Sequence, residues 1–153
     1  MGDPWLWFIP LFCILFWMLI CTIMAWLGGW RALGEAYPAA EKPQGRRFRM
    51  QKIRCGWVDY NGCVTLAVTP AGLYLAVWPL FRSGHPPLLL PWSSLHVLEL
   101  HEAWWGSHVV VAVDSPPLAR LRLPLKVVES AQEFRIPGKP AEPPSPVSPR
   151  DRE

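Results

Sequence analysis

The chain has 153 residues, of which 18% are charged and 51% hydrophobic, with 18 prolines, 10 tryptophans and a formal net charge of +3. This length accommodates one globular domain together with terminal appendages. The basic excess is small and lacks the broad, aromatic-interleaved basic surface that binds nucleic acid, so we expect no nucleic-acid partner.

An apolar run without charged residues extends from Pro4 to Trp30. It exceeds the roughly 20 apolar residues that cross a bilayer core of about 30 Å, which predicts a transmembrane helix over residues 4–30. Indole rings favour the headgroup region of a membrane. Tryptophans lie near both ends of this run: Trp5, Trp7, Trp26 and Trp30.

Two alternatives to a spanning helix stay open. A long apolar helix can be buried in a soluble core, and an N-terminal apolar segment can be a secretory signal peptide. A signal peptide has a basic start and about 7 to 15 apolar residues, whereas only the acidic Asp3 precedes this longer run. The Ala-x-Gly triplet formed by Ala32 and Gly34 still permits cleavage, which would export the domain.

Charges beside the run predict its orientation. Acidic residues are few between positions 31 and 54, and the basic residues there are Arg31, Lys42, Arg46, Arg47, Arg49, Lys52 and Arg54. Because positively charged loops stay in the cytoplasm, we expect a single-pass protein of the cell (inner) membrane, with its N-terminus outside and its domain cytoplasmic.

Cys55 and Cys63 are the cysteines that lie outside the apolar run. The dipeptide Asn61-Gly62 predicts a two-residue hairpin turn that pairs Tyr60 with Cys63. Cys55 then lies opposite Val68, about 16 Å from Cys63, and no disulfide can form. The alternative is an exported domain with both cysteines oxidised, which reverses the topology.

Residues 31–45 lack apolar periodicity and predict a short helical exit followed by a juxtamembrane linker. Residues 46–136 predict a mainly-β domain. Apolar residues recur there with period two, a pattern typical of strands. The expected strands are a first strand from Phe48, then 64–69, 73–78, 88–90, 95–101, 108–114 and 118–123.

The period changes to that of an amphipathic helix at Pro124, which is expected as the first helical residue of a segment reaching Arg135. The proline-rich residues 137–153 predict a disordered tail. The predicted fold is an N-terminal transmembrane α-helix plus a six- to seven-stranded antiparallel, partly open barrel with a C-terminal helix.

This order of elements, with GLYLAV on one strand and LLLPWSSL entering the next, resembles the pleckstrin-homology or GRAM-like domains of bacterial membrane proteins. More closely, GLYLAVWPLFRSGHPPLLLPWSSL is similar to a segment of uncharacterised bacterial single-span proteins. The resemblance covers Phe48–Phe134 and is most specific at FRSGHPPLLLPW. It implies a binding or scaffolding domain without catalytic residues. The basic cluster that holds inositol phosphates in eukaryotic relatives is missing, since the expected hairpin tip is Asp59–Gly62.

The loop Phe81–Pro87 carries Arg82 and His85 between two predicted strands. On an exposed loop these side chains could bind a carboxylate, a phosphate or a lipid headgroup. Alternatively, Arg82 pairs with a nearby acid and His85 hydrogen-bonds the loop backbone.

Two further features could contact a membrane. Trp104 and Trp105 lie in a connection between strands, where they enter the membrane interface or at least one of them folds back to cap the barrel. Arg46, Arg47 and Arg49 could lie on anionic lipid headgroups, at about 1 kcal/mol each. Their alternative role is the solvated face of a first strand.

Sequence motifs for metal binding or catalysis are weak. His96 and His101 are five residues apart on one strand and are expected on opposite faces, and the cysteines lack metal-ligand spacing. No serine has a nucleophile-elbow context. We therefore expect no metal, no cofactor, no catalytic residue and no enzyme activity.

The sequence thus predicts a membrane-anchored, non-enzymatic binding or scaffolding module that contacts the inner membrane surface or a membrane protein partner. The alternative is a small structural or assembly subunit, recruited to a larger membrane complex through its span or its proline-rich tail.

Overall fold

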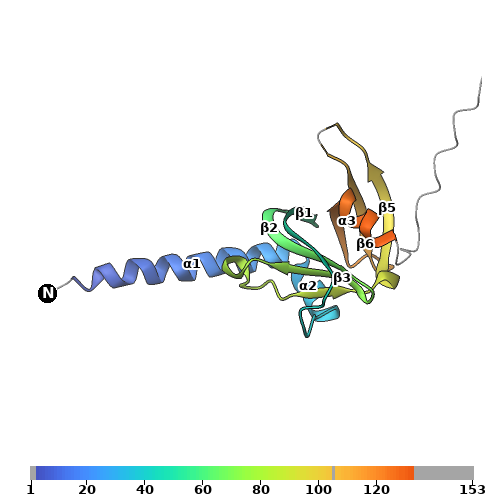
Figure 1. Cartoon of the computed structure of the whole chain (residues 1–153). Helices are drawn as coiled ribbons and strands as arrows, with labels where there is room; N and C mark the ends of the chain where they lie inside the picture. Colours follow the sequence, from blue (N-terminus) through green and yellow to red (C-terminus); the bar gives the residue numbers. More distant parts are fainter. Residues whose placement is uncertain (1–2, 105, 133–153) are drawn as a thin grey trace, which may run out of the picture.

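The structure is a computed structural model that describes residues 3–104 and 106–132. It begins with α1 (Trp5–Leu27), a rod that projects from the β domain (Figure 1). Within the described residues, α1 is the one helix long and apolar enough to cross a membrane. Every residue from 5 to 20 is exposed. The predicted apolar helix is confirmed, and it ends three residues before Trp30.

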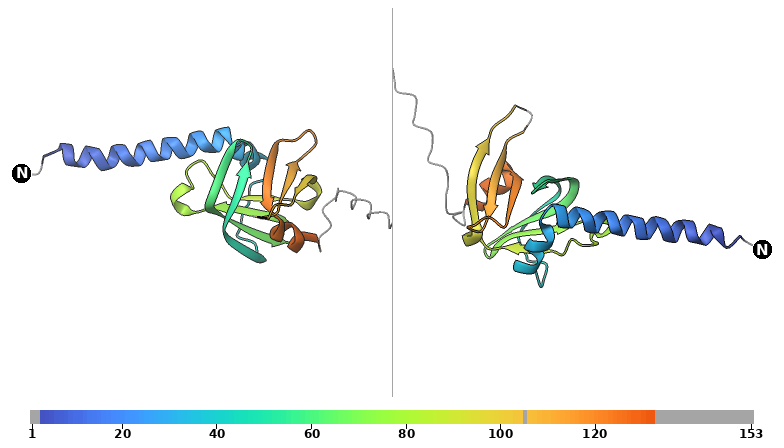
Figure 2. Two further views of the ribbon diagram at one scale, coloured as in Figure 1. Left: turned by 90° about the horizontal axis from the view of Figure 1, so that it is seen from above. Right: turned by 180° about the vertical axis from the view of Figure 1, so that it is seen from behind.

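Seven antiparallel strands form a single sheet curved into a half-barrel (Figures 1 and 2). Their order in the sheet is β4-β3-β2-β1-β7-β6-β5, so β4 and β5 form its edges. The strands are β1 (Arg46–Cys55), β2 (Val58–Thr69), β3 (Gly72–Val77), β4 (Leu88–Leu90), β5 (Leu95–His101), β6 (His108–Val113) and β7 (Ala119–Pro124). The prediction of an open antiparallel sheet of this size is confirmed.

Short helical elements complete the domain. Two 3-10 turns, η1 (Pro79–Phe81) and η2 (Trp92–Ser94), flank β4. The helix α3 (Leu125–Ala131) packs against β2, β6 and β7 and buries Val127 and Ala131. Pro124 is its N-cap and not its first helical residue. Arg135 and the tail at 137–153 lie outside the described residues.

Alternation along the strands places the core inside the half-barrel. In β7, Ala119, Leu121 and Leu123 are buried, whereas Arg120 and Arg122 are exposed, as their spacing predicts. The β2–β3 hairpin also forms as expected, with Thr69 paired with Gly72.

The predicted turn at Asn61-Gly62 is wrong. The turn between β1 and β2 lies at Gly56-Trp57, and Cys55 pairs with Val58. Asn61-Gly62 lies inside β2, at an irregularity of the β1–β2 pairing where Gly62 has φ +70°. Asn-Gly marks a need for positive φ, and a β-bulge meets that need as well as a turn does. Cys55 and Cys63 are both free thiols.

The segment expected as a short helical exit and a linker begins with a helix, as predicted, but this helix packs into the domain. The helical conformation is interrupted at Gly28-Gly29, where Gly29 has φ +75°. A second helix, α2 (Trp30–Ala36), follows directly. Trp30 and Leu33 are completely buried. The hydroxyl of Tyr37 donates to the carboxylate of Asp114 (2.6 Å). The expectation that Trp30 lies at a membrane interface is therefore wrong, and the β domain includes α2.

The burial of Trp30 is tested by comparing its replacement with that of Trp26, which lies four residues earlier and is 71% exposed. We expect Trp30→Ala to lower the free energy of unfolding by about 3–5 kcal/mol, because it removes a fully buried indole. Trp26→Ala should change it by less than about 0.5 kcal/mol. Urea unfolding in detergent measures both. Equal effects of the two substitutions would contradict the burial of Trp30.

Candidate functional site

The C-terminal end of α1 touches the β1–β2 hairpin tip backbone to backbone. A Cβ placed at Gly56 would lie 2.9 Å from the carbonyl oxygen of Gly28. A Cβ at Gly28 would lie 3.2 Å from the carbonyl oxygen of Cys55. The thiol of Cys55 donates to the Gly28 carbonyl (3.0 Å). Glycine on both sides therefore permits this close approach, and Gly56 also adopts φ +56°.

The loop between β3 and β4 runs back beside α1. The indole N–H of Trp17 donates to the carbonyl oxygen of Leu80 (3.1 Å), and the rings of Trp17 and Phe81 lie 5.4 Å apart. Closer to the domain, a Cβ at Gly84 would lie 3.1 Å from Cα of Thr22 and 3.3 Å from Cβ of Ala25. In Figures 1 and 2 this yellow-green loop reaches back toward the N-terminal side of the domain, alongside α1.

The apolar part of this loop is exposed on its outer side. We name residues Trp78–Phe81 the apolar loop. Trp78 is 62% exposed and Leu80 is 60% exposed. The amide of Phe81 donates to the Trp78 carbonyl (2.9 Å), and that of Arg82 donates to the Pro79 carbonyl (3.2 Å). The loop thus offers apolar side chains while several of its backbone polar groups are paired.

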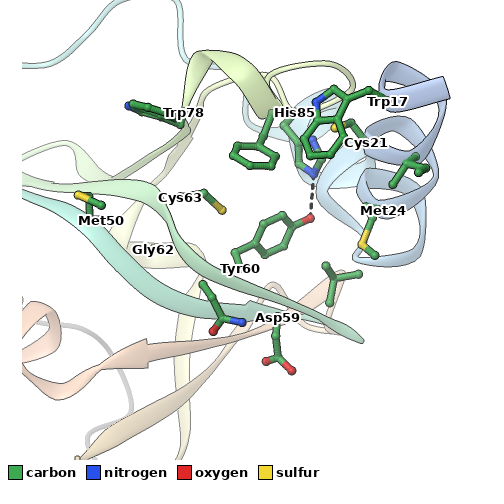
Figure 3. Close-up of a pocket in the computed structure, with 14 residues that line it drawn as sticks. Trp17, Cys21, Met24, Met50, Asp59, Tyr60, Gly62, Cys63, Trp78 and His85 are labelled. Atoms are coloured by element: carbon green, nitrogen blue, oxygen red, sulfur yellow. Dashed lines mark hydrogen bonds between the residues drawn. The ribbon is translucent and has the colours of Figure 1, made fainter. Parts of the chain in front are cut away.

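Three aromatic side chains meet beneath the loop. His85 makes edge contacts with Trp30 and Tyr60, at centroid distances of 5.5 and 5.4 Å. The Nδ1 atom of His85 lies 3.0 Å from the carbonyl oxygen of Ser83, which can only accept. Nδ1 therefore carries the proton, and the Tyr60 hydroxyl donates to the unprotonated Nε2 (2.9 Å; Figure 3). The indole of Trp30 donates to the Pro86 carbonyl (2.9 Å).

Burial holds the titratable groups of this cluster neutral. It lowers the pKa of His85, because the imidazolium form is poorly solvated there. It raises the pKa of Tyr60 and raises the pKa of the Cys55 thiol to about 12. The cluster is thus uncharged at neutral pH and internally hydrogen-bonded.

A cavity of about 490 Å³ lies between α1 and β2 (Figure 3). This volume falls within the roughly 300 to 1,000 Å³ of small-molecule sites. Its walls are mainly apolar and include Trp17, Ile20, Met24, Val58, Cys63 and Phe81. The Tyr60–His85 pair lines it, and Asp59 and Asn61 also border it. We call it the junction cavity, and it is the candidate binding site.

The two contact residues expected in the FRSGHPP stretch differ in exposure. Arg82 is exposed and follows the apolar loop directly. His85 is 2% exposed, so its expected place on the outside of the loop is wrong. It bonds the loop backbone, as the alternative interpretation expected, and faces the junction cavity.

The other expected contacts are not brought to this site. Arg46, Arg47 and Arg49 are exposed at the start of β1, whereas the last residue of β1, Cys55, meets α1. Trp104 is 92% exposed and therefore does not cap the barrel. Trp105 lies outside the described residues.

A basic groove on the outer sheet face escaped the sequence analysis. Arg54 on β1 pairs directly with Arg122 on β7, and Arg120 lies two residues earlier on that strand. These three arginines and the exposed Trp57 line a groove of about 520 Å³. Arg54 also approaches Asp59 (3.7 Å). The sequence shows each arginine, but the arginines come together only through the pairing of β1 with β7. The periodicity of neighbouring residues does not predict which strands pair.

The histidines of β5 and β6 do not lie as expected. A pairing shift between Val97 and Glu99 changes the alternation of β5, so that His96 and His101 share a face. His101 stacks on His108 at 5.2 Å and bonds Glu99 (2.8 Å). In the part of the chain that the structure describes, no group of three or more His, Cys, Asp or Glu residues could hold a metal ion.

The chain thus joins one candidate spanning helix to a mainly-β half-barrel through a tightly packed junction. No protein-family model, no curated protein and no solved structure matches it. The resemblance to pleckstrin-homology and GRAM-like domains therefore stays a prediction.

The lowered pKa of His85 predicts an acid-sensitive fold. As the pH falls below about 6.5, the unfolded chain takes up a proton that buried His85 resists, so the free energy of unfolding decreases until the pH passes the lowered pKa. We expect His85→Gln to reduce this decrease, as measured by unfolding between about pH 7.5 and about pH 5.

Tyr60→Phe is the matched control, because it removes the hydrogen bond to His85 but keeps the imidazole. It should cost about 1–3 kcal/mol at neutral pH and retain the acid sensitivity. An unchanged pH dependence in His85→Gln would contradict the assignment. The pKa of His108 is also lowered, but His108 contributes the same pH dependence to the unsubstituted protein and to both variants.

Proposed function

We propose that this protein is a membrane-anchored, non-enzymatic binding module. In this proposal α1 spans the bilayer, the N-terminus is outside, and a β domain of pleckstrin-homology type contacts the inner membrane surface. The length and exposure of α1 support a spanning role. The basic residues after α1 support a cytoplasmic domain.

The contact between Trp17 and Leu80 is the observation that carries the proposal. At 1.5 Å per residue, α1 is about 35 Å long and matches a hydrocarbon core of about 30 Å. Trp17 lies only twelve residues after Trp5, about 18 Å along the helix. The part of α1 before this contact is therefore too short to cross a membrane. A spanning α1 thus carries the apolar loop into the inner leaflet.

The composition of the apolar loop suits that depth. Trp78 and Leu80 present apolar side chains outward. Backbone polar groups need partners in hydrocarbon, and the Leu80 carbonyl accepts the indole N–H of Trp17. Arg82, exposed immediately after the loop, can extend its guanidinium to a lipid phosphate. Anionic lipid headgroups are the partners that this arrangement favours.

The chemistry of the junction favours binding over catalysis. His85, Tyr60 and Cys55 are buried titratable groups of the β domain at this junction, and each is hydrogen-bonded within the protein. A general base needs a pKa near the working pH and access to a substrate proton. Burial moves all three pKa values toward the neutral forms instead.

One observation favours the second candidate, a subunit of a larger membrane assembly. The edge strand β5 exposes Leu98 (45%) and Leu100 (46%). An apolar edge strand is a surface onto which a partner protein can add. In that case β5, as well as the apolar loop, is covered in the native membrane.

Single cysteines at Leu80 and Leu98 test these proposals, in a protein whose four native cysteines are alanine. Both positions are exposed in the structure. A membrane-impermeant maleimide is applied to intact cells and to opened membranes. We expect Leu98→Cys to react only after opening, and Leu80→Cys to react in neither case, because hydrocarbon excludes the reagent.

Other outcomes have distinct meanings. Equal reaction of both thiols in opened membranes would contradict insertion of the apolar loop. Reaction of Leu98→Cys in intact cells would reverse the orientation. A Leu98→Cys thiol that is protected in opened membranes and reactive after purification would favour the assembly subunit.

A further inference from the structure

We infer that the junction cavity binds an acyl chain of a membrane phospholipid. This inference rests on the proposed function, because it needs α1 to span the bilayer. It goes further in naming a ligand class and a site inside the protein, where the proposal names only a surface contact.

The position of the cavity determines which molecules can reach it. One wall is the C-terminal half of α1, where Trp17, Ile20 and Met24 are 40%, 36% and 43% exposed. The opposite wall is β2, with Val58 and Cys63. In a spanning α1 the Trp17 level lies in the inner leaflet, so the cavity opens sideways into lipid. Acyl chains are the molecules present there at the highest concentration.

The lining suits a hydrocarbon chain. The Tyr60 hydroxyl and His85 Nε2 are hydrogen-bonded to each other. A hydrocarbon chain beside this pair therefore deprives neither atom of a hydrogen-bond partner. Met24 and Met50 supply flexible, polarisable side chains that adapt to an irregular apolar ligand. No buried side-chain nitrogen or oxygen among the described residues lacks a hydrogen-bond partner.

The cavity also has a polar end. Asp59 and Asn61 border it close to the hairpin tip, which meets the C-terminal end of α1. Arg54 approaches the Asp59 carboxylate at 3.7 Å and offsets its charge. This end therefore lies toward the headgroup region and the Trp17 end toward the bilayer centre. A phospholipid enters with its chain along α1 and its ester groups near Asn61.

Local backbone geometry opens this space. The β1–β2 pairing shifts between Phe48 and Gln51 and again between Gln51 and Ile53. Met50 has φ +52° and Gly62 has φ +70°, and both line the cavity. Positive φ at a methionine is strained, and such strain concentrates at binding sites. The two irregularities replace a regular strand pair at the place where the cavity lies.

Photolabelling tests the inference with the full chain reconstituted in phosphatidylcholine vesicles. A small fraction of the lipid carries a diazirine in its acyl chain, and adducts are mapped by mass spectrometry. We expect adducts on residues 58–63 of β2, in addition to those on the lipid-facing side of α1. Without lipid in the cavity, hydrocarbon has no route to the β2 wall.

Two methionines of α1 provide matched variants. Met24 lines the cavity and is 43% exposed, whereas Met18 is 46% exposed and is not part of its lining. Met24→Trp should fill the cavity and reduce β2 adducts by roughly tenfold, the change for about 1.4 kcal/mol of lost affinity. Met18→Trp should leave them unchanged. Cys63→Phe fills the cavity from the β2 side and should repeat the result of Met24→Trp.

The contrary outcomes separate this inference from the proposed function. Adducts on Trp78–Phe81 without adducts on 58–63 would overturn the acyl-chain site and leave membrane contact standing. Absence of both sets would overturn both proposals. Equal β2 labelling in Met24→Trp and Met18→Trp would also overturn the site, as would co-purification of a different class of apolar molecule in the cavity.

Discussion

Close packing of α1 against the domain is the constraint on which the rest of the structure depends. The helix ends at Gly28-Gly29, and the turn there folds Trp30 and Leu33 into the core. Gly56 and Gly84 bring the hairpin tip and the β3–β4 loop within contact distance of the helix backbone. Without side chains at these positions, van der Waals contact replaces what would be a flexible linker. The helix α1 and the β domain therefore form one body.

In the proposed function, rigid attachment changes what α1 does as a membrane anchor. A flexible linker would let the β domain drift from the bilayer, whereas this junction holds the apolar loop at the level of Trp17. Fixing a weak apolar contact to the span removes most of the entropic cost of forming it. The same geometry creates the junction cavity, because α1 supplies one wall and the bulged β2 supplies the other. The proposed membrane contact and the candidate binding site thus share one structural cause.

Local periodicity predicted much of this fold. The alternation in β7 and the boundary between the strands expected at 64–69 and 73–78 depend on neighbouring residues alone, and both were confirmed. The burial of Trp30 in the core was not predicted, because an indole suits a membrane interface and a protein core equally well. His85 was misplaced for a related reason: its partner Tyr60 is 25 positions away in sequence. The junction cavity was beyond prediction, because it exists only where distant elements meet.

Crosslinking in isolated membranes tests the packing of α1 on the domain most directly. The rings of Trp17 on α1 and Phe81 on the β3–β4 loop lie 5.4 Å apart, and neither position requires glycine. In a background without native cysteines, the pair Trp17→Cys and Phe81→Cys should be joined by a short bifunctional thiol reagent. Leu19→Cys, at an exposed position on another face of α1, should not pair with Phe81→Cys. Failure of the first pair, or equal crosslinking of both, would show that α1 does not pack on the domain in the membrane.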